Sequence, residues 1–385
     1  MTAPIVIIGG GMAAGNAAVE LRESGFDGDV VLFAGESHPP YERPPLSKGY
    51  LAGKAEAEDA YLKPSQWYAD RDIDVRTGTH VESIHLADKV VHAADGSQAW
   101  SRLLIATGAQ PRTLPLESTD HMAVVYLRSL DDARRLRERA VAGARLLVVG
   151  GGWIGMEVAA TARGRGAEVT LVEPAEQPLL NALGPELGRR LADIHRGHGV
   201  DLRTSTSVET LRDRHAVLSD GTELEVDTVL VGIGAAPDDA LARDAGLDVD
   251  NGILVDAGLR TSHADVFAAG DVANHAHPLL DERVRVEHWQ NAVSQGKVAA
   301  HALLGETVVY DDMPSFFSDQ YDLGLEYFGH PGAAGTDSVR IDPGSGDDPN
   351  ALTAWWFRGE TLVAAMHVNE WDRSKELAER VRAGH

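Results

Sequence analysis

A glycine-rich turn in the middle of the chain has the residue types and spacing needed to hold a dinucleotide. Gly150, Gly152 and Gly155 follow the apolar run 146–149 and open the Ala-rich segment 153–165. In a Gly-x-Gly-x-x-Gly turn the first glycine allows the bend. The second lets a pyrophosphate approach the backbone, and the third lets helix pack on strand. Free N–H groups at the helix N-terminus then hold the anion. A purely structural glycine-rich turn is the alternative.

An acidic residue completes this pattern. Glu173 lies 173 − 150 = 23 residues after Gly150 and follows the apolar run 169–172. A carboxylate at this place accepts a hydrogen bond from a ribose 2′-OH and repels a 2′-phosphate. We therefore expect this site to take NADH in preference to NADPH.

The N-terminus repeats the same pattern. Gly9, Gly11 and Ala14 form the variant turn Gly-x-Gly-x-x-Ala and open the Ala-rich segment 12–24. The candidate acid is Glu36, which lies 36 − 9 = 27 residues after Gly9. The position at the N-terminus, together with a second nucleotide site, favours FAD here.

These turns require a particular fold to position them. Each lies in a strand–helix–strand unit, and the two units start 150 − 9 = 141 residues apart, which indicates two separate doubly wound domains. We therefore predict an α/β fold with two Rossmann-like nucleotide-binding domains and a small C-terminal α+β domain. The loop 342–350 is rich in Gly, Asp and Pro. The strands of the first repeat are expected at 5–8 and 30–33, and those of the second at 146–149 and 169–172. Further strands are expected at 103–106, 229–232, 266–269, 323–328, 352–357 and 362–368. A closing helix is expected at 371–382.

Composition excludes several classes of function. The 385 residues carry 35 basic and 59 acidic side chains, and 35 − 59 gives a net charge of −24, so nucleic acid is not an expected partner. There is no cysteine, which rules out thiol redox chemistry, disulfides and Cys-ligated metal. No apolar run approaches the ~18–20 residues of a membrane helix. We expect a cytoplasmic protein with no membrane contact and no metal site.

Several polar residues admit two interpretations from sequence alone. Asp271 either accepts a hydrogen bond from a ligand hydroxyl or caps a helix. Arg43 and Lys48 either face a cofactor or belong to a Pro-rich surface turn in which Ser47 caps a helix. Glu157 interrupts an apolar helix face, and a buried carboxylate needs a partner, for which Lys48 is the candidate.

Other residues are expected to have structural roles. His195 and His198 fall at a predicted helix end and are expected to be solvated. His275 and His277 lack a third ligand for a metal. The run 355–357 is expected in the core or at a domain interface.

Taken together, these motifs resemble a known family. The two turns, the segment 43–48 (Arg-Pro-Pro-Leu-Ser-Lys), Ala106-Thr107-Gly108 and Gly270-Asp271 resemble the NADH-dependent ferredoxin reductases, which serve cytochromes P450 and Rieske oxygenases. The same fold occurs in apoptosis-inducing factor and glutathione reductase. The resemblance covers nearly the whole chain.

The resemblance implies a domain plan and a set of site residues. It implies an FAD-binding domain at 1–112 and 242–312, an NADH-binding domain at 113–241 and a C-terminal domain at 313–385. Lys48 and Glu157 match positions that pair beside the flavin N5, and the segment 287–289, with Trp289, matches the stretch that reaches the flavin and the nicotinamide. The implied FAD-binding residues are Gly9, Gly11, Ala13, Ala14, Glu36, Arg43, Lys48, Val81, Ala106, Thr107, Gly108, Arg128, Gly270, Asp271, Glu287, His288 and Trp289. The implied NADH-binding residues are Gly150, Gly152, Ile154, Gly155, Glu157, Glu173, Gly232 and Gly234.

The resemblance also implies a reaction. Hydride passes from NADH to the flavin, and single electrons then leave for a [2Fe–2S] ferredoxin, with the protein a monomer or weak homodimer. Two alternatives stay open: an NADH-dependent reductase of a small acceptor (a quinone, an organic radical or O₂), and an NADH-sensing flavoprotein like apoptosis-inducing factor. The chain departs from the family pattern at Phe317, where many members have Trp, and at Asn181, where many have Arg. The basic residues Arg283, Arg285, Arg373, Lys375, Arg380 and Arg382 are candidates for a ferredoxin-docking patch.

Overall fold

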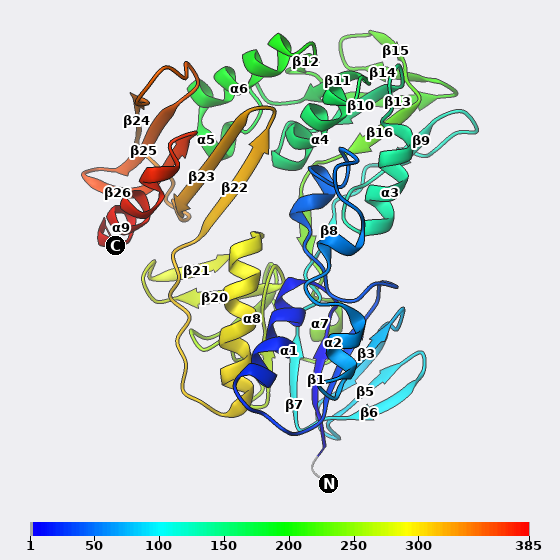
Figure 1. Cartoon of the computed structure of the whole chain (residues 1–385), viewed down its shortest axis with the longest axis vertical. Helices are drawn as coiled ribbons and strands as arrows, with labels where there is room; N and C mark the ends of the chain where they lie inside the picture. Colours follow the sequence, from blue (N-terminus) through cyan, green and yellow to red (C-terminus); the bar gives the residue numbers. More distant parts are fainter. Residues whose placement is uncertain (1–2, 385) are drawn as a thin grey trace.

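The structure, a computed structural model, describes residues 3–384. Two parallel sheets lie one above the other, and an antiparallel sheet lies beside the upper one (Figure 1). We call the parts built on these sheets the first lobe (the sheet with β1), the second lobe (the sheet with β10) and the C-terminal lobe (the sheet with β22 to β26).

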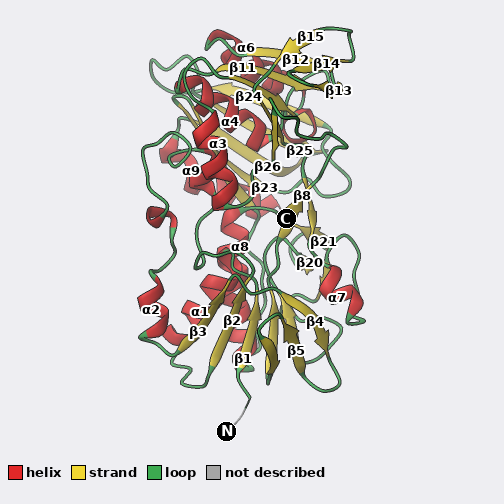
Figure 2. Ribbon diagram, turned by 90° about the vertical axis from the view of Figure 1, so that its right-hand side faces the viewer, coloured by secondary structure: helices red, strands yellow, loops and turns green. Residues whose placement is uncertain are grey.

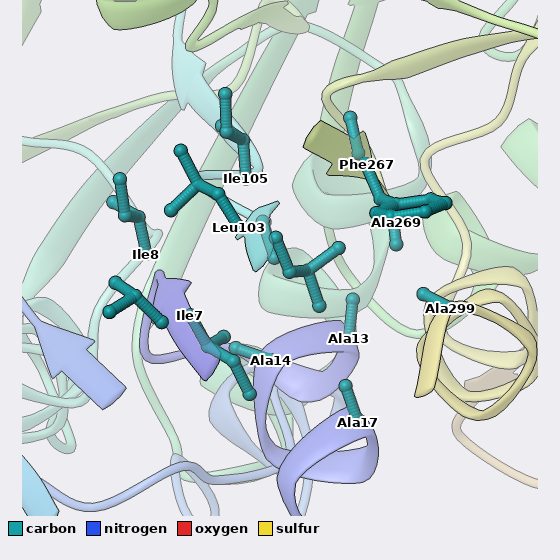
Figure 3. Close-up of a cluster of buried hydrophobic side chains, with 14 of the residues drawn as sticks. Ile7, Ile8, Ala13, Ala14, Ala17, Leu103, Ile105, Phe267, Ala269 and Ala299 are labelled. Carbon is teal, nitrogen blue, oxygen red and sulfur yellow. The ribbon is translucent and has the colours of Figure 1, made fainter. Parts of the chain in front are cut away.

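The first lobe is built on short apolar strands that are buried on both faces, as parallel strands require. Its five-stranded sheet has the order β19-β7-β1-β2-β3. Helices α1 (Met12–Glu23) and α8 (Trp289–Leu304) lie side by side against it. Figure 3 shows the core between sheet and helices, with Ile7, Leu103 and Phe267 beside small residues of α1 and α8. The strands are β1 (Ile5–Ile8), β2 (Val30–Ala34), β3 (Ile73–Thr77), β7 (Arg102–Ile105) and β19 (Val266–Ala268).

The second lobe repeats this plan. Its five-stranded parallel sheet has the order β12-β11-β10-β16-β9. Helix α4 (Trp153–Gly164) follows β10 directly, as α1 follows β1, and α6 (Pro185–Gly197) precedes β12. Helix α3 (Leu130–Arg139) begins in a capping box formed by Ser129 and Asp132. The strands are β9 (Ala123–Val125), β10 (Arg145–Val149), β11 (Glu168–Glu173), β12 (Asp201–Thr204) and β16 (Thr228–Val231).

Two short strands join the lobes. β8 (Ala109–Pro111) and β17 (Ala235–Pro237) pair antiparallel, so the chain crosses from the first lobe to the second and back at one place. This crossing lies between the two large sheets (Figure 2). Three small accessory sheets are formed by β4 (Val81–His85), β5 (Val90–Ala93) and β6 (Gly96–Ala99); by β13 (Val208–Arg212), β14 (His215–Leu218) and β15 (Glu223–Glu225); and by β18 (Ile253–Val255), β20 (Ala273–His277) and β21 (Glu282–Arg285).

The C-terminal lobe is a five-stranded antiparallel sheet of order β22-β23-β26-β25-β24, closed by α9 (Ser374–Gly384). Trp355 lies buried between the sheet and α9, and Trp356 faces the other core, which confirms the expected core role of this aromatic run. The strands are β22 (Ser315–Gln320), β23 (Leu323–Gly329), β24 (Ser338–Pro343), β25 (Leu352–Arg358) and β26 (Thr361–Val368), and the remaining short helices are η1 (Pro44–Ser47), η2 (Glu58–Ala60), α2 (Ser65–Ala69), α5 (Leu180–Leu183), α7 (Ala240–Asp244) and η3 (Trp371–Arg373).

The C-terminal lobe shares its core with the second lobe. Leu187 and Leu191 of α6 belong to the same buried cluster as Leu325 and Met366 of the antiparallel sheet. Because one apolar cluster spans both lobes, the sheet is fixed to the nucleotide-binding unit with β10 as well as to the chain before it.

The predicted fold class is confirmed, with some corrections. The predicted strands and helices are present to within about a residue or two at their ends, within the usual uncertainty of element boundaries, except that the closing helix α9 begins at Ser374, after the separate turn η3. Several strands were not expected, among them β3, β9 and β12 of the parallel sheets and β22 and β24 of the antiparallel one, and the loop predicted at 342–350 begins inside β24. No helix among residues 3–384 has the length and apolar character needed to cross a membrane.

Candidate functional site

The first nucleotide turn joins β1 to α1. Gly9 has a φ of +134°, and a Cβ on it would lie 2.1 Å from the carbonyl oxygen of Ala106, which follows β7. Only glycine fits this approach of two strand ends. Helix α1 begins at Met12 after an extended Gly11, with no side-chain cap, and a Cβ on Gly11 would meet nothing within 4 Å. The turn therefore presents uncapped N–H groups to an open space, which suits a pyrophosphate.

Charged side chains gather around this first turn. Glu36, two residues after β2, accepts hydrogen bonds from the Tyr41 hydroxyl at 2.5 Å and from Arg43 Nη2 at 2.9 Å. Arg43 also donates to the carbonyl oxygen of Arg128, and Arg128 Nη2 lies 3.1 Å from Asp271 Oδ2. This places the two guanidinium groups and two carboxylates in one network drawn from four separate segments. Burial lowers the pKa of Arg128 from its ordinary value.

The network extends to the start of α8. Arg285 Nη1 donates to the carbonyl oxygen of Asp271 at 3.1 Å and to Glu287 Oε1 at 2.6 Å. His288 is the N-terminal flanking residue of α8 and Trp289 its first residue. Burial lowers the pKa of His288 to about 4, so this ring is neutral at pH 7. His288 Nδ1 and Trp289 Nε1 are buried without a hydrogen-bond partner.

The second nucleotide turn reproduces the first. Gly150 has a φ of +106°, and a Cβ on it would lie 2.4 Å from the carbonyl oxygen of Gly232, which follows β16. A Cβ on Gly155 would lie 2.0 Å from the carbonyl oxygen of Gly150. Helix α4 begins after an extended Gly152 with no side-chain cap. Ile154, in the first turn of α4, is 43% exposed and so lies at the open side of this site.

Glu173, the acid beside the second turn, has different hydrogen-bond donors from Glu36 beside the first. Glu173, the last residue of β11, accepts hydrogen bonds from the backbone N–H of Gly151 at 2.7 Å and of Ala175 at 2.8 Å. These bonds fix both carboxylate oxygens beside the turn. Each oxygen keeps a further acceptor position, so the group remains able to bind ribose hydroxyls.

Lys48 and Glu157 meet between the two turns. Lys48 Nζ lies 2.6 Å from Glu157 Oε2, and Glu157 is 3% exposed on the inner face of α4. Ser47 donates to the same oxygen at 2.5 Å, and Ser318 of β22 donates to Oε1 at 2.7 Å. The Lys48 ammonium also lies 5.4 Å from the centre of the Phe317 ring. Three parts of the fold thus converge on one buried carboxylate.

The site residues fit two dinucleotides. Both turns keep a glycine-lined approach to an uncapped helix N-terminus, and an acid lies beside each. The ring nitrogens His288 Nδ1 and Trp289 Nε1, beside the first turn's network, have no hydrogen-bond partner, and polar atoms of a ligand could bind them. The described residues therefore match the needs of FAD and of a nicotinamide nucleotide.

The remaining predicted residues lie at or beside strand ends or in α1. Thr107 donates to the carbonyl oxygen of Asp238 at 2.6 Å, and Gly108 has a φ of +77°. Gly270, after β19, has a φ of +81° and approaches Ala13 closely. Val81 begins β4 and packs against the first lobe's core. The site's other predicted glycine and alanine positions are Ala14 in α1 and Gly234 before β17.

Three interpretations made from sequence are corrected. Ser47 ends η1 and hydrogen-bonds Glu157, so it caps no helix. No helix starts at Asp271, which binds Arg128 instead. His195 is fully buried and not solvated, because α6 packs against the C-terminal lobe, although His198 is exposed as expected. Tyr41, Ser318 and Gln320 were missed, since single hydroxyl or amide residues carry no spacing signal in a sequence.

The candidate docking residues do not form a free basic patch. Arg373 and Arg380 both bind Glu376, and Arg382 binds Asp311. Arg285 binds Glu287, as above, and Arg283 donates to backbone carbonyl oxygens. Lys375, 87% exposed in its side chain, has Glu379 at 3.8 Å. The positive charges considered for docking are thus largely offset by neighbouring acids or used within the fold.

Comparison with known proteins finds matches over nearly the whole chain. Residues 3–296 match the family model described as pyridine nucleotide-disulphide oxidoreductase, and residues 315–381 match the one described as reductase C-terminal. The chain is 40% identical to the anthranilate 1,2-dioxygenase system ferredoxin–NAD(+) reductase component of Burkholderia cepacia, over 95% of this chain and 91% of the relative. It is 38% identical to putidaredoxin reductase of Pseudomonas putida, over 97% and 91%. A chain in the crystal structure of the covalent putidaredoxin reductase–putidaredoxin complex superimposes with a TM-score of 0.92 at 36% identity, covering 99% of this chain and 93% of that one.

Proposed function

The chain belongs to the pyridine nucleotide-disulphide oxidoreductase family, and from that premise we propose that it is an FAD-dependent, NADH-oxidising ferredoxin reductase. Its partner would be a [2Fe–2S] ferredoxin that serves an oxygenase. The observation that carries this proposal is the pairing of two dinucleotide turns around one buried Lys48–Glu157 ion pair, in a chain that has no cysteine.

We assign FAD to the first turn and NADH to the second. The first turn is enclosed by side chains of several segments, including Arg43 and Arg128, whose guanidinium groups can donate hydrogen bonds to a pyrophosphate that stays bound. The second turn offers mainly backbone groups and Glu173, which suits a nucleotide that must leave after each turnover. The domain plan follows: FAD at 1–112 and 242–312, NADH at 113–241, and a C-terminal lobe at 313–385.

A bound FAD would supply the redox chemistry, which is acceptance of hydride from NADH and release of single electrons. The residues of the chain orient and shield that exchange. Lys48, held by Glu157, places a positive charge between the two turns, where it stabilises negative charge that develops on transfer. Trp289 and Phe317, whose ring centres lie 6.3 Å apart, line the same region with apolar surface and exclude water.

The absence of cysteine determines how electrons leave. Relatives that reduce disulfides need a redox-active cysteine pair, and this sequence contains none. Electrons must therefore pass from the flavin to an external acceptor. Because NADH is produced and consumed inside the cell, we place this activity in the cytoplasm.

The experiment that tests the proposal is NADH oxidation by the FAD-loaded protein with cytochrome c as final acceptor. The rate should rise strongly when a [2Fe–2S] ferredoxin is added. The control is the same assay with apo-ferredoxin, which should give no rise. No rise with any of a panel of [2Fe–2S] ferredoxins would overturn the assigned partner.

A small-acceptor reductase is the second candidate, and one observation favours it. The net charge is −24, and the arginines considered for docking are already bound to acids or backbone groups. An acidic ferredoxin would meet an acidic surface, which slows association. Fast, saturable reduction of a quinone without any carrier protein would support this candidate.

A further inference from the structure

A buried line of hydrogen bonds runs from α6 to the Lys48–Glu157 pair. The Tyr321 hydroxyl lies 3.2 Å from His195 Nδ1, and His195 Nε2 lies 2.9 Å from Gln320 Oε1. Gln320 Nε2 donates to Ser318 Oγ at 3.2 Å, and Ser318 donates to Glu157 Oε1 at 2.7 Å. The proposed chemistry uses only the last of these residues.

The pleat of β22 explains how this line arises. Alternate residues of a strand face the same side. Ser318 and Gln320 both face the second lobe, where they meet Glu157 of α4 and His195 of α6. Phe317, which directly precedes Ser318, faces Lys48 and Trp289 on the other side. One strand therefore contacts the ion pair from two directions.

All the protons in the line point the same way. An amide oxygen only accepts, so His195 must donate from Nε2 and accept from Tyr321 at Nδ1. The amide nitrogen of Gln320 only donates, so Ser318 is left to donate its own proton to the carboxylate. Hydrogen bonds aligned in one direction polarise and strengthen each other, and here the last one ends on a negative charge.

We infer that Gln320, held by His195, is a positioning residue that acts through Ser318 to fix the Glu157 carboxylate and with it the Lys48 ammonium. This inference rests on the proposed function, in which Lys48 acts beside the reacting groups. Neither Gln320 nor His195 touches Lys48, so their effect is transmitted and not direct.

Burial is what makes the alignment matter. Glu157 is almost inaccessible, and its three polar contacts, with Ser47, Ser318 and Lys48, replace the water that an ionised carboxylate would otherwise bind. If Ser318 is not held, its hydroxyl can rotate away and the carboxylate loses one donor. The state of His195 agrees with the alignment, because burial lowers its pKa to about 4 and leaves the ring neutral at pH 7.

The experiment compares four variants of the FAD-loaded protein in stopped-flow reduction by NADH. Ser318→Ala removes the donor to Glu157 and should lower the limiting rate of flavin reduction about tenfold, the value of one charge-assisted hydrogen bond. Gln320→Met and His195→Phe keep the volume but free Ser318, so we expect losses of about threefold. His195→Gln keeps a donor in place of Nε2 and should restore most of the rate.

A second readout separates positioning from general damage. Because the line changes the charge distribution near the flavin, the midpoint potential of the bound flavin should shift in the same order as the rates: Ser318→Ala, then Gln320→Met and His195→Phe, then His195→Gln. The apparent dissociation constant for NADH should stay within about twofold of wild type, since uniform binding is not affected.

Thr353→Val is the matched control. Thr353 is fully buried and donates to Glu370 Oε2 at 2.8 Å, so its loss also removes a hydroxyl from a buried carboxylate, but away from the line. It should lower stability and leave both the rate and the potential unchanged.

The outcomes are distinguishable. If Ser318→Ala changes rate and potential while Gln320→Met and His195→Phe match wild type, the positioning role of the outer residues is wrong. If Thr353→Val has the same effects as Gln320→Met, the effects are structural and the inference also fails. Failure of the proposed function would instead appear in wild type, as no flavin reduction by NADH or no ferredoxin-dependent electron transfer.

Discussion

The two nucleotide turns share a backbone and differ in what surrounds it. In each, a positive-φ glycine packs against the carbonyl oxygen of the residue after a neighbouring strand: Gly9 against Ala106, and Gly150 against Gly232. Each leads into a helix that has no side-chain cap. Around the first turn, however, Glu36 is held by side chains, whereas Glu173 is held by backbone N–H groups.

This difference suits one turn to a nucleotide that stays bound and the other to a nucleotide that exchanges. Side chains from separate segments close around the first turn, and a ligand leaving it would give up contacts with the half-buried guanidinium groups of Arg43 and Arg128. The second turn is built from one continuous strand–turn–helix unit and leaves Ile154 exposed at its edge. The shared geometry binds a pyrophosphate, and the surroundings determine whether the nucleotide stays or exchanges.

Alanine substitution at the two leading glycines tests this division most directly. Gly9→Ala places a Cβ at a φ of +134° and 2.1 Å from a carbonyl oxygen, so we expect flavin retention to weaken about tenfold or more. Gly150→Ala should keep its flavin and lose about 100-fold in kcat/KM for NADH. Flavin absorbance of the purified proteins and steady-state kinetics measure both.

The control is Gly25→Ala, which has a φ of +80° and nothing within 4 Å of the added Cβ. It carries similar backbone strain without the crowding and should purify with full flavin and normal kinetics. If Gly9→Ala keeps its flavin and Gly150→Ala loses it, the assignment of the two turns is reversed.

Local patterns were enough to predict the two turns, because each is contained in about thirty residues of continuous sequence, the length of a strand–helix–strand unit. Strands β22 and β24 escaped prediction for the opposite reason. β22 (Ser315–Gln320) contains polar residues whose burial depends on α4 and α6 of another lobe. The alternation of its buried and exposed faces can be recognised only when the surfaces that it packs against are known.

The site shows the same limit. Lys48 and Glu157 lie 157 − 48 = 109 residues apart, and their meeting was suggested by the family resemblance and by the need of a buried carboxylate for a partner, not by any local pattern. His195 was misassigned because α6 looks amphipathic by itself, with His195 in its last turn. Its burial is set by packing against Tyr321 and Gln320, which no periodicity of α6 reveals.

Substitution of the two acids sharpens the comparison further, with a smaller expected effect. Glu173→Gln removes the charge that repels a 2′-phosphate, so the ratio of kcat/KM for NADPH to that for NADH should rise about tenfold. Glu36→Gln, the matched change at the first turn, should leave this ratio unchanged, because Glu36 is bound to Arg43 and Tyr41. Kinetics with the two nucleotides would decide, and a rise in the ratio for Glu36→Gln alone would contradict the assignment.

Low pH should destabilise the second lobe through His195, and this is the smallest of the three predicted effects. Burial lowers the pKa of this ring from 6.5 to about 4, so between these values the unfolded chain binds a proton that the folded chain does not. Stability therefore falls as the pH falls through that window, by about 2 kcal/mol between pH 7 and pH 5 from this residue. His195→Gln, which cannot be protonated, should lose that much less free energy of unfolding over the same interval, measured by urea titration at each pH.

The control is His198→Gln, on the exposed end of α6, which should lose as much stability as wild type. Equal losses in His195→Gln and wild type would mean that the ring reaches water, and the contact between α6 and β22 would then be looser than the first turn's enclosing network.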